Sequence, residues 1–234
     1  MTDSKKYVKP KGDPGSLRPT AIGLWVLGLV FEVLGILILM PHVVTLPAFV
    51  LENQTLWLIV ALGIDFVLVV IGSLLWKRAN RIDPPSEKNK VEFFMKTQLG
   101  VIIAVIAFLP ILVVLLSNKD LDKKSKTWVS ALAAILLVLA SLFSAEFNPI
   151  SLEDLQQMEV NAAESDFGQG TVQWSKNSKV YHTWSECPSL KMIYESNLRE
   201  GVTKAAFEAG KARMCFKCAD HFHIIDGVEK RGSD

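Results

Sequence analysis

Residues 21–40 read AIGLWVLGLVFEVLGILILM, a stretch of twenty residues with one ionisable side chain, Glu32. Three more apolar stretches follow, at residues 56–76, 99–116 and 128–145, and Asp65 is the one ionisable residue among them. About 18 or more consecutive apolar residues are enough to cross the roughly 30 Å hydrocarbon layer of a bilayer as a helix. The sequence therefore predicts an all-α membrane domain of four transmembrane helices.

The composition leaves room for one small soluble module besides this membrane domain. The chain has 234 residues, 50% of them hydrophobic, and 25 Lys and Arg balance 24 Asp and Glu. This balance argues against a nucleic-acid binder driven by bulk charge. The predicted parts are a basic cytoplasmic tail (1–20), the four-helix transmembrane domain (21–145), a juxtamembrane helix or linker (146–173), a small α+β module (174–228) and a tail (229–234).

Basic residues predict how the chain lies across the membrane. The segment before the first span and the connection between the second and third spans hold eleven Lys and Arg, whereas the other two connections hold four. Lys and Arg are enriched on the cytoplasmic side of membrane proteins. We therefore expect both termini in the cytoplasm of a cell with this protein in its cell membrane, most simply the inner membrane of a bacterium.

The connections outside the spans carry local signals. Residues 77–98 are charged and interrupted by Pro84 and Pro85, so we expect a linker that packs no core. After the fourth span, Ser151 is placed to cap a short juxtamembrane helix that begins at Leu152. A disordered acidic linker through residues 166–170 is the alternative.

Glu32 and Asp65 both fall near the middle of their predicted spans. Gly28 lies one turn before Glu32, and Gly72 two turns after Asp65, so each acid shares a helix face with small residues. Small residues let helices approach closely, and we expect the two carboxyl groups to meet inside the first helical hairpin, with at least one of them protonated. Two interpretations remain open: a path for protons or cations, and protonated acids that hydrogen-bond to each other or to the backbone and hold the bundle together.

All three cysteines lie in the C-terminal module, as Cys187 and the pair Cys215-Phe-Lys-Cys218. An odd number of cysteines in a reducing compartment favours metal binding over a disulfide framework. His182 and Cys187 form a second pair about 30 residues upstream of the first. Together they make four ligands of the kind that Zn²⁺ binds tetrahedrally.

The surrounding residues resemble a known zinc module. Val180-Tyr-His precedes the first ligand pair as an expected strand, Thr203 is placed to cap a helix, and Gly210 is placed to end that helix before the second pair. This pattern resembles a small bacterial zinc module similar to the metal-binding domain of the Ada DNA-repair protein and to modules of some nucleases and competence proteins. The resemblance covers about 40 residues of the 234, and Met214 stands where the pattern usually has Pro.

The resemblance implies His182, Cys187, Cys215 and Cys218 as the ligands of Zn²⁺. His221 and His223 follow closely and could each replace His182, although the spacing of His182 to Cys187 matches the module better. Buried, reduced thiols without a metal are the alternative for the whole cluster. Four protein ligands leave no position for water, so the zinc would be structural.

No enzyme motif is visible, whether a Ser-His-Asp arrangement, a phosphate-binding glycine loop or a His-Glu-x-x-His helix. We therefore expect a membrane protein, not an enzyme, whose zinc module binds or scaffolds a protein partner at the cytoplasmic membrane surface. One alternative is a small proton-coupled transporter or channel subunit that uses Glu32 and Asp65, and a homo-oligomer is compatible with either. A third is a membrane-tethered nucleic-acid binder, although a solvated face is the favoured explanation of the basic residues that it would use. These residues of the module are Lys176, Lys179, Lys191, Arg199, Lys204, Lys211, Arg213 and Lys217.

Overall fold

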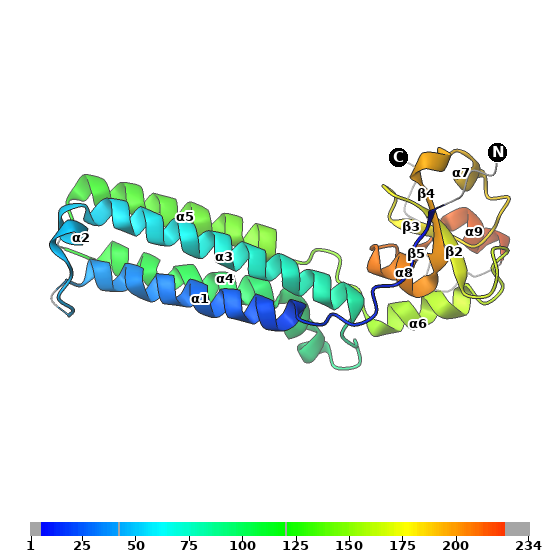
Figure 1. The fold of residues 1–234 in the computed structure, drawn as a ribbon, viewed down its shortest axis with the longest axis horizontal. Helices are drawn as coiled ribbons and strands as arrows, with labels where there is room; N and C mark the ends of the chain where they lie inside the picture. Colours follow the sequence, from blue (N-terminus) through cyan, green and yellow to red (C-terminus); the bar gives the residue numbers. More distant parts are fainter. Residues whose placement is uncertain (1–5, 42, 120, 223–234) are drawn as a thin grey trace. The chain divides into compact units, whose positions relative to one another are not determined.

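The structure is a computed structural model that describes residues 6–41, 43–119 and 121–222 (Figure 1). Two compact units make up the fold. The bundle unit consists of residues 15–79 and 90–149, and the module unit consists of Asn80–Asn89 together with the described residues up to Pro14 and from Ile150 onward. Each unit has its own buried hydrophobic core.

The bundle unit contains four long helices that lie side by side (Figure 1). All four are long and apolar enough to cross a membrane. The helices, including one short helix in the first connection, are α1 (Leu17–Leu39), α2 (Ala48–Glu52), α3 (Gln54–Ile82), α4 (Lys90–Ser117) and α5 (Lys123–Ser144).

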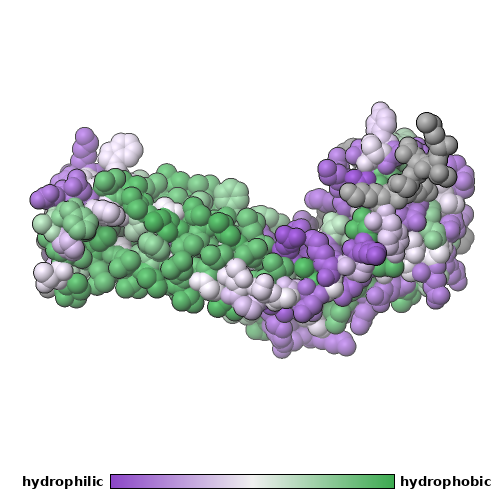
Figure 2. Space-filling view, in the orientation of Figure 1, coloured by the Kyte–Doolittle hydropathy of each residue, from purple (hydrophilic) through white to green (hydrophobic). Residues whose placement is uncertain are grey.

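The side chains on the outside of the bundle are mostly apolar. Val26, Val33 and Val67 are each more than half exposed, and hydrophobic residues cover most of the visible bundle surface in Figure 2. Soluble proteins rarely expose apolar patches of this extent, whereas lipid-facing helices do so routinely.

Glycines on the inner faces of α1 and α3 allow these helices to pack closely. A Cβ atom at Gly28 would lie 2.7 Å from Oδ1 of Asp65, and one at Gly72 would lie 2.6 Å from Nε1 of Trp25. The Trp25 indole N–H donates to the carbonyl oxygen of Val69 at 3.3 Å. The predicted small-residue faces are therefore the buried faces, as Gly28, Glu32 and Gly35 show on α1.

The charged connection between α3 and α4 differs from the prediction. Helix α3 continues to Ile82 and α4 begins at Lys90, because the flanking Lys, Arg and Glu residues favour helix, and an ion pair of 2.6 Å joins Lys96 to Glu92 one turn earlier. The expectation that this connection packs no core is wrong. Pro84 and Pro85 are buried in the module unit, and the amide of Leu152 donates to the Pro85 carbonyl at 3.0 Å.

The module unit is a small sheet covered by short helices. Four strands from its C-terminal part and β1 from the N-terminal segment form one sheet in the order β1-β4-β2-β3-β5. Its elements are β1 (Lys6–Tyr7), α6 (Leu152–Asn161), β2 (Thr171–Ser175), β3 (Val180–His182), α7 (Pro188–Lys191), the 3₁₀ helix η1 (Glu195–Asn197), β4 (Leu198–Val202), α8 (Thr203–Glu208), β5 (Arg213–Met214) and α9 (Phe216–His221).

Strand β1 makes the N-terminal segment part of this sheet, although the sequence predicts a separate tail. It runs parallel to β4, and the Val8 amide donates to the Glu200 carbonyl at 2.7 Å. Gly201 permits this approach, because a Cβ atom there would lie 2.5 Å from the Val8 carbonyl oxygen. The tail prediction fails because a two-residue strand depends on its partner and leaves no pattern of its own.

The helix caps of the module unit agree with the prediction in two of three cases. Ser151 caps α6 in a reciprocal capping box with Asp154. Gly210 directly follows the C-cap of α8, and its left-handed backbone, with φ of +77°, ends the helix as predicted. The predicted cap at Thr203 is wrong. Helix α8 begins at Thr203 itself, Val202 is its N-cap, and the Thr203 amide donates to the Gly170 carbonyl at 2.9 Å.

Candidate metal centre

The first ligand pair sits where β3 ends. His182 is the last residue of β3, which pairs with β2 through Gln173 opposite His182. The chain then turns, with the Cys187 amide donating to the Trp184 carbonyl at 3.3 Å, and Cys187 becomes the N-cap of α7, followed by a proline in the first turn. The turn returns Cys187 toward the end of the strand that carries His182.

The second pair opens α9. Cys215 is the N-cap of α9 and Cys218 lies in its first turn, where the Cys218 amide donates to the Cys215 carbonyl at 3.0 Å. Strand β5, just before it, lies parallel to β3 with Met214 opposite Tyr181. This pairing places the start of α9 beside the end of β3, and therefore places the second pair beside the first.

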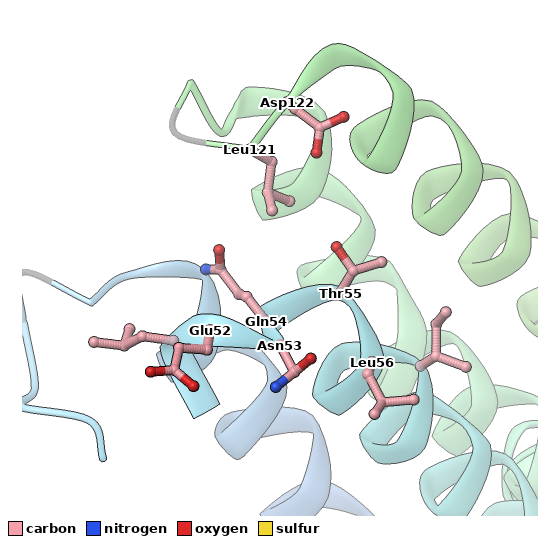
Figure 3. Close-up of a pocket in the computed structure, with 9 residues that line it drawn as sticks. Glu52, Asn53, Gln54, Thr55, Leu56, Leu121 and Asp122 are labelled. Atoms are coloured by element: carbon pink, nitrogen blue, oxygen red, sulfur yellow. The ribbon is translucent and has the colours of Figure 1, made fainter. Parts of the chain in front are cut away.

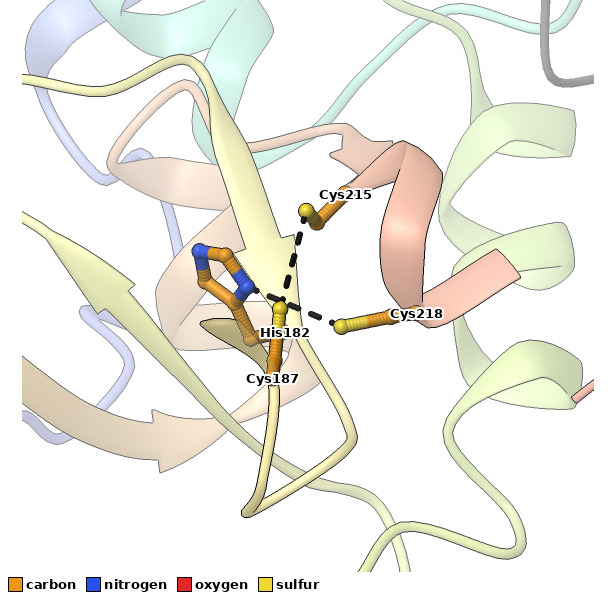
Figure 4. Close-up of side chains that lie close together, drawn as sticks. All are labelled: His182, Cys187, Cys215 and Cys218. Atoms are coloured by element: carbon orange, nitrogen blue, oxygen red, sulfur yellow. Dashed lines mark hydrogen bonds between the residues drawn. The ribbon is translucent and has the colours of Figure 1, made fainter. Parts of the chain in front are cut away.

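The four side chains converge on one point (Figure 4). Sγ of Cys187 lies 4.0 Å from Sγ of Cys215, and Nδ1 of His182 lies 3.6 Å from Sγ of Cys218. All four candidate ligand atoms lie within 4.8 Å of one another. Zn–S bonds of about 2.3 Å and Zn–N bonds of about 2.0 Å would separate tetrahedral ligand atoms by roughly 3.5 to 3.8 Å, so a small contraction would fit the set to a metal ion.

The cluster is buried and its thiols are free. Cys187 and Cys218 are fully buried, His182 is 2% exposed and Cys215 is 6% exposed. Backbone amides face the sulfurs: those of Thr183 and Trp184 hydrogen-bond to Cys218 and that of Lys217 to Cys215. Amide donors of this kind stabilise thiolates, the form in which cysteine binds metals.

Among the four candidate ligands, the thiols of Cys215 and Cys218 have shifted pKa values. A hydrogen bond from Cys218 lowers the pKa of the Cys215 thiol, and His182 lowers it further, against the opposing effect of burial. The pKa of Cys218 is raised, first by its role as donor to Cys215 and then by burial. The hydrogen bond from Cys218 and the neighbouring His182 therefore favour a thiolate at Cys215.

Hydrogen bonds of Asp166, a residue outside the ligand group, hold the loop that carries Cys187. The amide and the hydroxyl of Ser185 both donate to Oδ2 of Asp166 at 2.8 Å, and the Asp166 amide donates to the Thr183 carbonyl at 3.0 Å. The hydrogen bonds from Ser185 lower the pKa of Asp166. No sequence motif indicates this support, because Asp166 and Ser185 are 19 residues apart.

The structure places His221 outside the ligand group. Its ring stacks on Trp184 at a centroid distance of 4.0 Å and an interplanar angle of 5°. Among the described residues, the group that could hold a metal contains His182 instead. His223, the other alternative ligand, lies outside the described residues.

One of the basic residues considered for nucleic-acid binding is not on the surface. Lys211 is 6% exposed, and its ammonium group donates to the carbonyl oxygens of Lys176 and Ser178. Burial lowers the pKa of Lys211. This lysine therefore fixes the turn between β2 and β3 and offers no charge to a ligand.

The two acids of the bundle unit are buried, Glu32 at 5% exposure and Asp65 at 1%. Both Asp65 oxygens and Oε1 of Glu32 have no hydrogen-bond partner among the described residues. These three atoms therefore form no hydrogen bond between the acids, whereas the backbone amide of Ile111 hydrogen-bonds to the Glu32 carboxyl, as the structural interpretation allows.

A cavity of about 630 Å³ lies in the bundle unit between residues 51–59 and Leu121–Asp122 (Figure 3). Its acidic side chains are Glu52 and Asp122. The Asp122 carboxylate accepts from the Ser125 amide at 2.9 Å as the cap of α5, so a helix end already uses it. We assign this cavity no ligand.

Comparison of the chain with protein-family models, with curated proteins and with solved structures finds no match. The resemblance to the Ada-type module therefore remains a prediction. The convergence of one histidine and three cysteines into a group able to hold a metal ion is an observation of the structure.

Proposed function

We propose that this chain is an integral membrane protein whose cytoplasmic module holds a structural Zn²⁺ and binds a protein partner at the membrane surface. It performs no catalysis in this proposal. Two observations carry it: the buried group of His182, Cys187, Cys215 and Cys218, and the presence of four long apolar helices in the same chain. Three sulfurs and one imidazole are a typical ligand set for structural zinc.

The chain segments that make up the module unit support a topology in which each of the four long helices crosses the membrane once. Residues that precede α1, residues that connect α3 to α4 and residues that follow α5 all belong to this unit. Helices that each cross once, in alternating directions, bring these three segments out on the same side of a bilayer. The hydrogen bonds between β1 and β4 fit this arrangement, because they require both chain ends in one compartment.

Charge and redox chemistry favour the cytoplasm as that compartment. The segments that belong to the module unit or flank it hold most of the basic residues near the spans. The three cysteines are free, as expected in a reducing environment. A module that needs thiolate ligands is better placed there than in an oxidising compartment.

The surface of the module offers a place for a partner. Met192 is 75% exposed and Tyr194 is 81% exposed, and both follow α7, the helix that Cys187 begins. Exposed Met and Tyr are enriched at protein interfaces. The zinc would fix α7 and thereby the segment that carries these two side chains.

Metal analysis of the purified full-length protein tests the module. We expect one zinc per chain, lost in Cys218→Ser and retained in Ser196→Ala, which alters an exposed residue of the same unit. A wild-type protein that is folded and metal-free would contradict the proposal.

Cysteine labelling of intact cells tests the orientation. A membrane-impermeant maleimide should label Lys123→Cys, at the start of α5, and leave Lys88→Cys, in the connection between α3 and α4, unlabelled. Both positions are exposed in the structure. The reverse pattern would place the module outside the cytoplasm.

Photocrosslinking in cells tests the binding role. A photoreactive residue at Tyr194 should give a protein adduct that is absent when the same residue replaces exposed Glu164, and absent when Cys218→Ser is added. Adducts with nucleic acid would favour the third alternative, and no adduct from either position would contradict a scaffold.

A further inference from the structure

The buried acids of the bundle unit have no function in the proposal above. Glu32 on α1 and Asp65 on α3 face the interior, and Gly28 provides the space that Asp65 occupies. When both are ionised, they repel each other electrostatically. The backbone amide of Ile111 on α4 hydrogen-bonds to the Glu32 carboxyl, whose Oε1 remains without a partner among the described residues. Pro110, just before it, interrupts the hydrogen-bond pattern of α4 at this level.

Cations at the cytoplasmic ends of the helices are engaged elsewhere. The Arg18 guanidinium lies over the Trp76 ring at 5.8 Å, and the Lys77 ammonium donates to the carbonyls of Phe143 and Ala145 at 2.8 Å and 2.6 Å. Within the apolar stretches of α1, α3, α4 and α5, Glu32 and Asp65 are the two ionisable side chains. No described residue therefore neutralises the pair.

The surroundings of the pair suit a proton better than a metal cation. Gly28 faces the Asp65 carboxyl, and the other side chains nearest to Gly28 are those of Val69 and Leu68. The side chain of Ile111 fills the space beside Gly35. These groups offer no oxygen ligands. Hard cations such as Mg²⁺ and Ca²⁺ take six or more oxygen ligands, whereas a proton needs one carboxyl oxygen.

We propose that Glu32 and Asp65 form a proton-binding site inside the helix bundle, which takes up a proton from water and releases it again. Uptake forms one O–H bond on a carboxylate oxygen and changes the charge of the pair by +1, with no electron transferred. Three carboxyl oxygens without a partner, on side chains more than nine-tenths buried, carry this inference. It goes beyond the proposed function and is independent of the metal site.

Labelling of the full-length protein in lipid nanodiscs with N,N′-dicyclohexylcarbodiimide, which reacts with protonated carboxyl groups in apolar surroundings, tests the site. Peptide mass spectrometry should find the adduct on Glu32 or Asp65 near neutral pH, with the yield falling as the pH rises. Exposed Glu52, in the same unit, should remain unmodified. The adduct should disappear in the double variant Glu32→Gln/Asp65→Asn and persist in Glu52→Gln.

Two outcomes would overturn the proposal. One is the absence of any adduct at either acid in folded wild-type protein, which requires no variant to fold. The other is protection of the acids by Na⁺ or K⁺ at constant pH, which would make the pair a metal-cation site. Infrared spectra of the same nanodiscs should show a carboxylic acid C=O band that is lost in the double variant. Zinc content should be unchanged in that variant, so the two proposals fail separately.

Discussion

The amide of Cys215 donates a hydrogen bond of 2.8 Å to the carbonyl of Tyr181, the residue before His182. This bond joins the backbone of one ligand pair to the backbone of the other. Tyr181 is itself 1% exposed in the core of the module, and its burial raises its pKa to about 12. We therefore expect formation of the sheet and assembly of the ligand group to be coupled.

This coupling predicts that loss of one ligand unfolds the whole module. Apparent zinc-binding energies in small domains are about 10 kcal/mol or more at pH 7, which exceeds the stability that a module of this size draws from its core. Cys215→Ser should abolish the near-ultraviolet circular dichroism of Trp174, Tyr181 and Trp184, which are buried or half-buried. Ser196→Ala is the control. A full native signal in folded, zinc-free Cys215→Ser would contradict the coupling.

Asp166 should matter for stability in a pH-dependent manner. Its folded pKa is depressed by the hydrogen bonds from Ser185, so its contribution is present above the unfolded pKa and is lost as the pH falls through the folded pKa, below about 4. Asp166→Asn should cost no more than about 1 kcal/mol, because the carboxylate is largely exposed to solvent. Thermal unfolding of wild type and variant at pH 7 and at pH 3 measures this, and the difference should shrink at pH 3. A difference that grows at pH 3 would contradict the assignment.

Lys211 should be structural despite its charge. Lys211→Met removes the charged donor to two carbonyls that close the turn between β2 and β3, and a hydrogen bond from a charged group contributes about 1.5–3 kcal/mol to stability. Lys179→Met, at an exposed position of the same turn, should change stability by less than about 0.5 kcal/mol. Chemical denaturation of the full-length protein compares the two. Equal effects would mean that the Lys211 contacts contribute nothing.

Gly201 should be required for docking of the N-terminal strand. In Gly201→Ala the new Cβ would meet the Val8 carbonyl oxygen at 2.5 Å and Trp174 at 3.1 Å, and backbone oxygen cannot move aside cheaply. Hydrogen exchange of the Val8 amide should become faster, while Glu195→Ala, at an exposed position in η1, leaves it protected. Unchanged protection in Gly201→Ala would show that β1 can shift without separating.

Gly72 should set the distance between α1 and α3. Gly72→Ala forces the Trp25 indole away and breaks its hydrogen bond to Val69, at a cost of about 1–3 kcal/mol. Gly63→Ala is the matched control, because nothing lies within 4 Å of a Cβ there and alanine favours helix. Thermal unfolding in detergent should therefore rank Gly63→Ala at or above wild type and Gly72→Ala below it.

The features that the sequence predicts are those that local residues determine. Hydropathy alone indicates α1, α3, α4 and α5, and the His-x₄-Cys and Cys-x₂-Cys spacings indicate the four residues that converge. The helix ends were less predictable, because Lys, Arg and Glu continue a helix beyond its apolar part.

The remaining features depend on contacts between distant segments. Strand β1 needs β4, nearly two hundred residues later, and burial of Pro85 needs the amide of Leu152. Support of the Cys187 loop by Asp166 likewise has no local signal. The charge of Lys211 predicts a surface residue, but the structure buries this side chain.

Translation reaches β1 nearly two hundred residues before it reaches β4. The segment that forms β1 therefore has no strand partner while the four apolar helices are synthesised. The sheet can be completed only after translation has passed Met214 at the end of β5, so a chain cut short before that residue would lack the finished sheet.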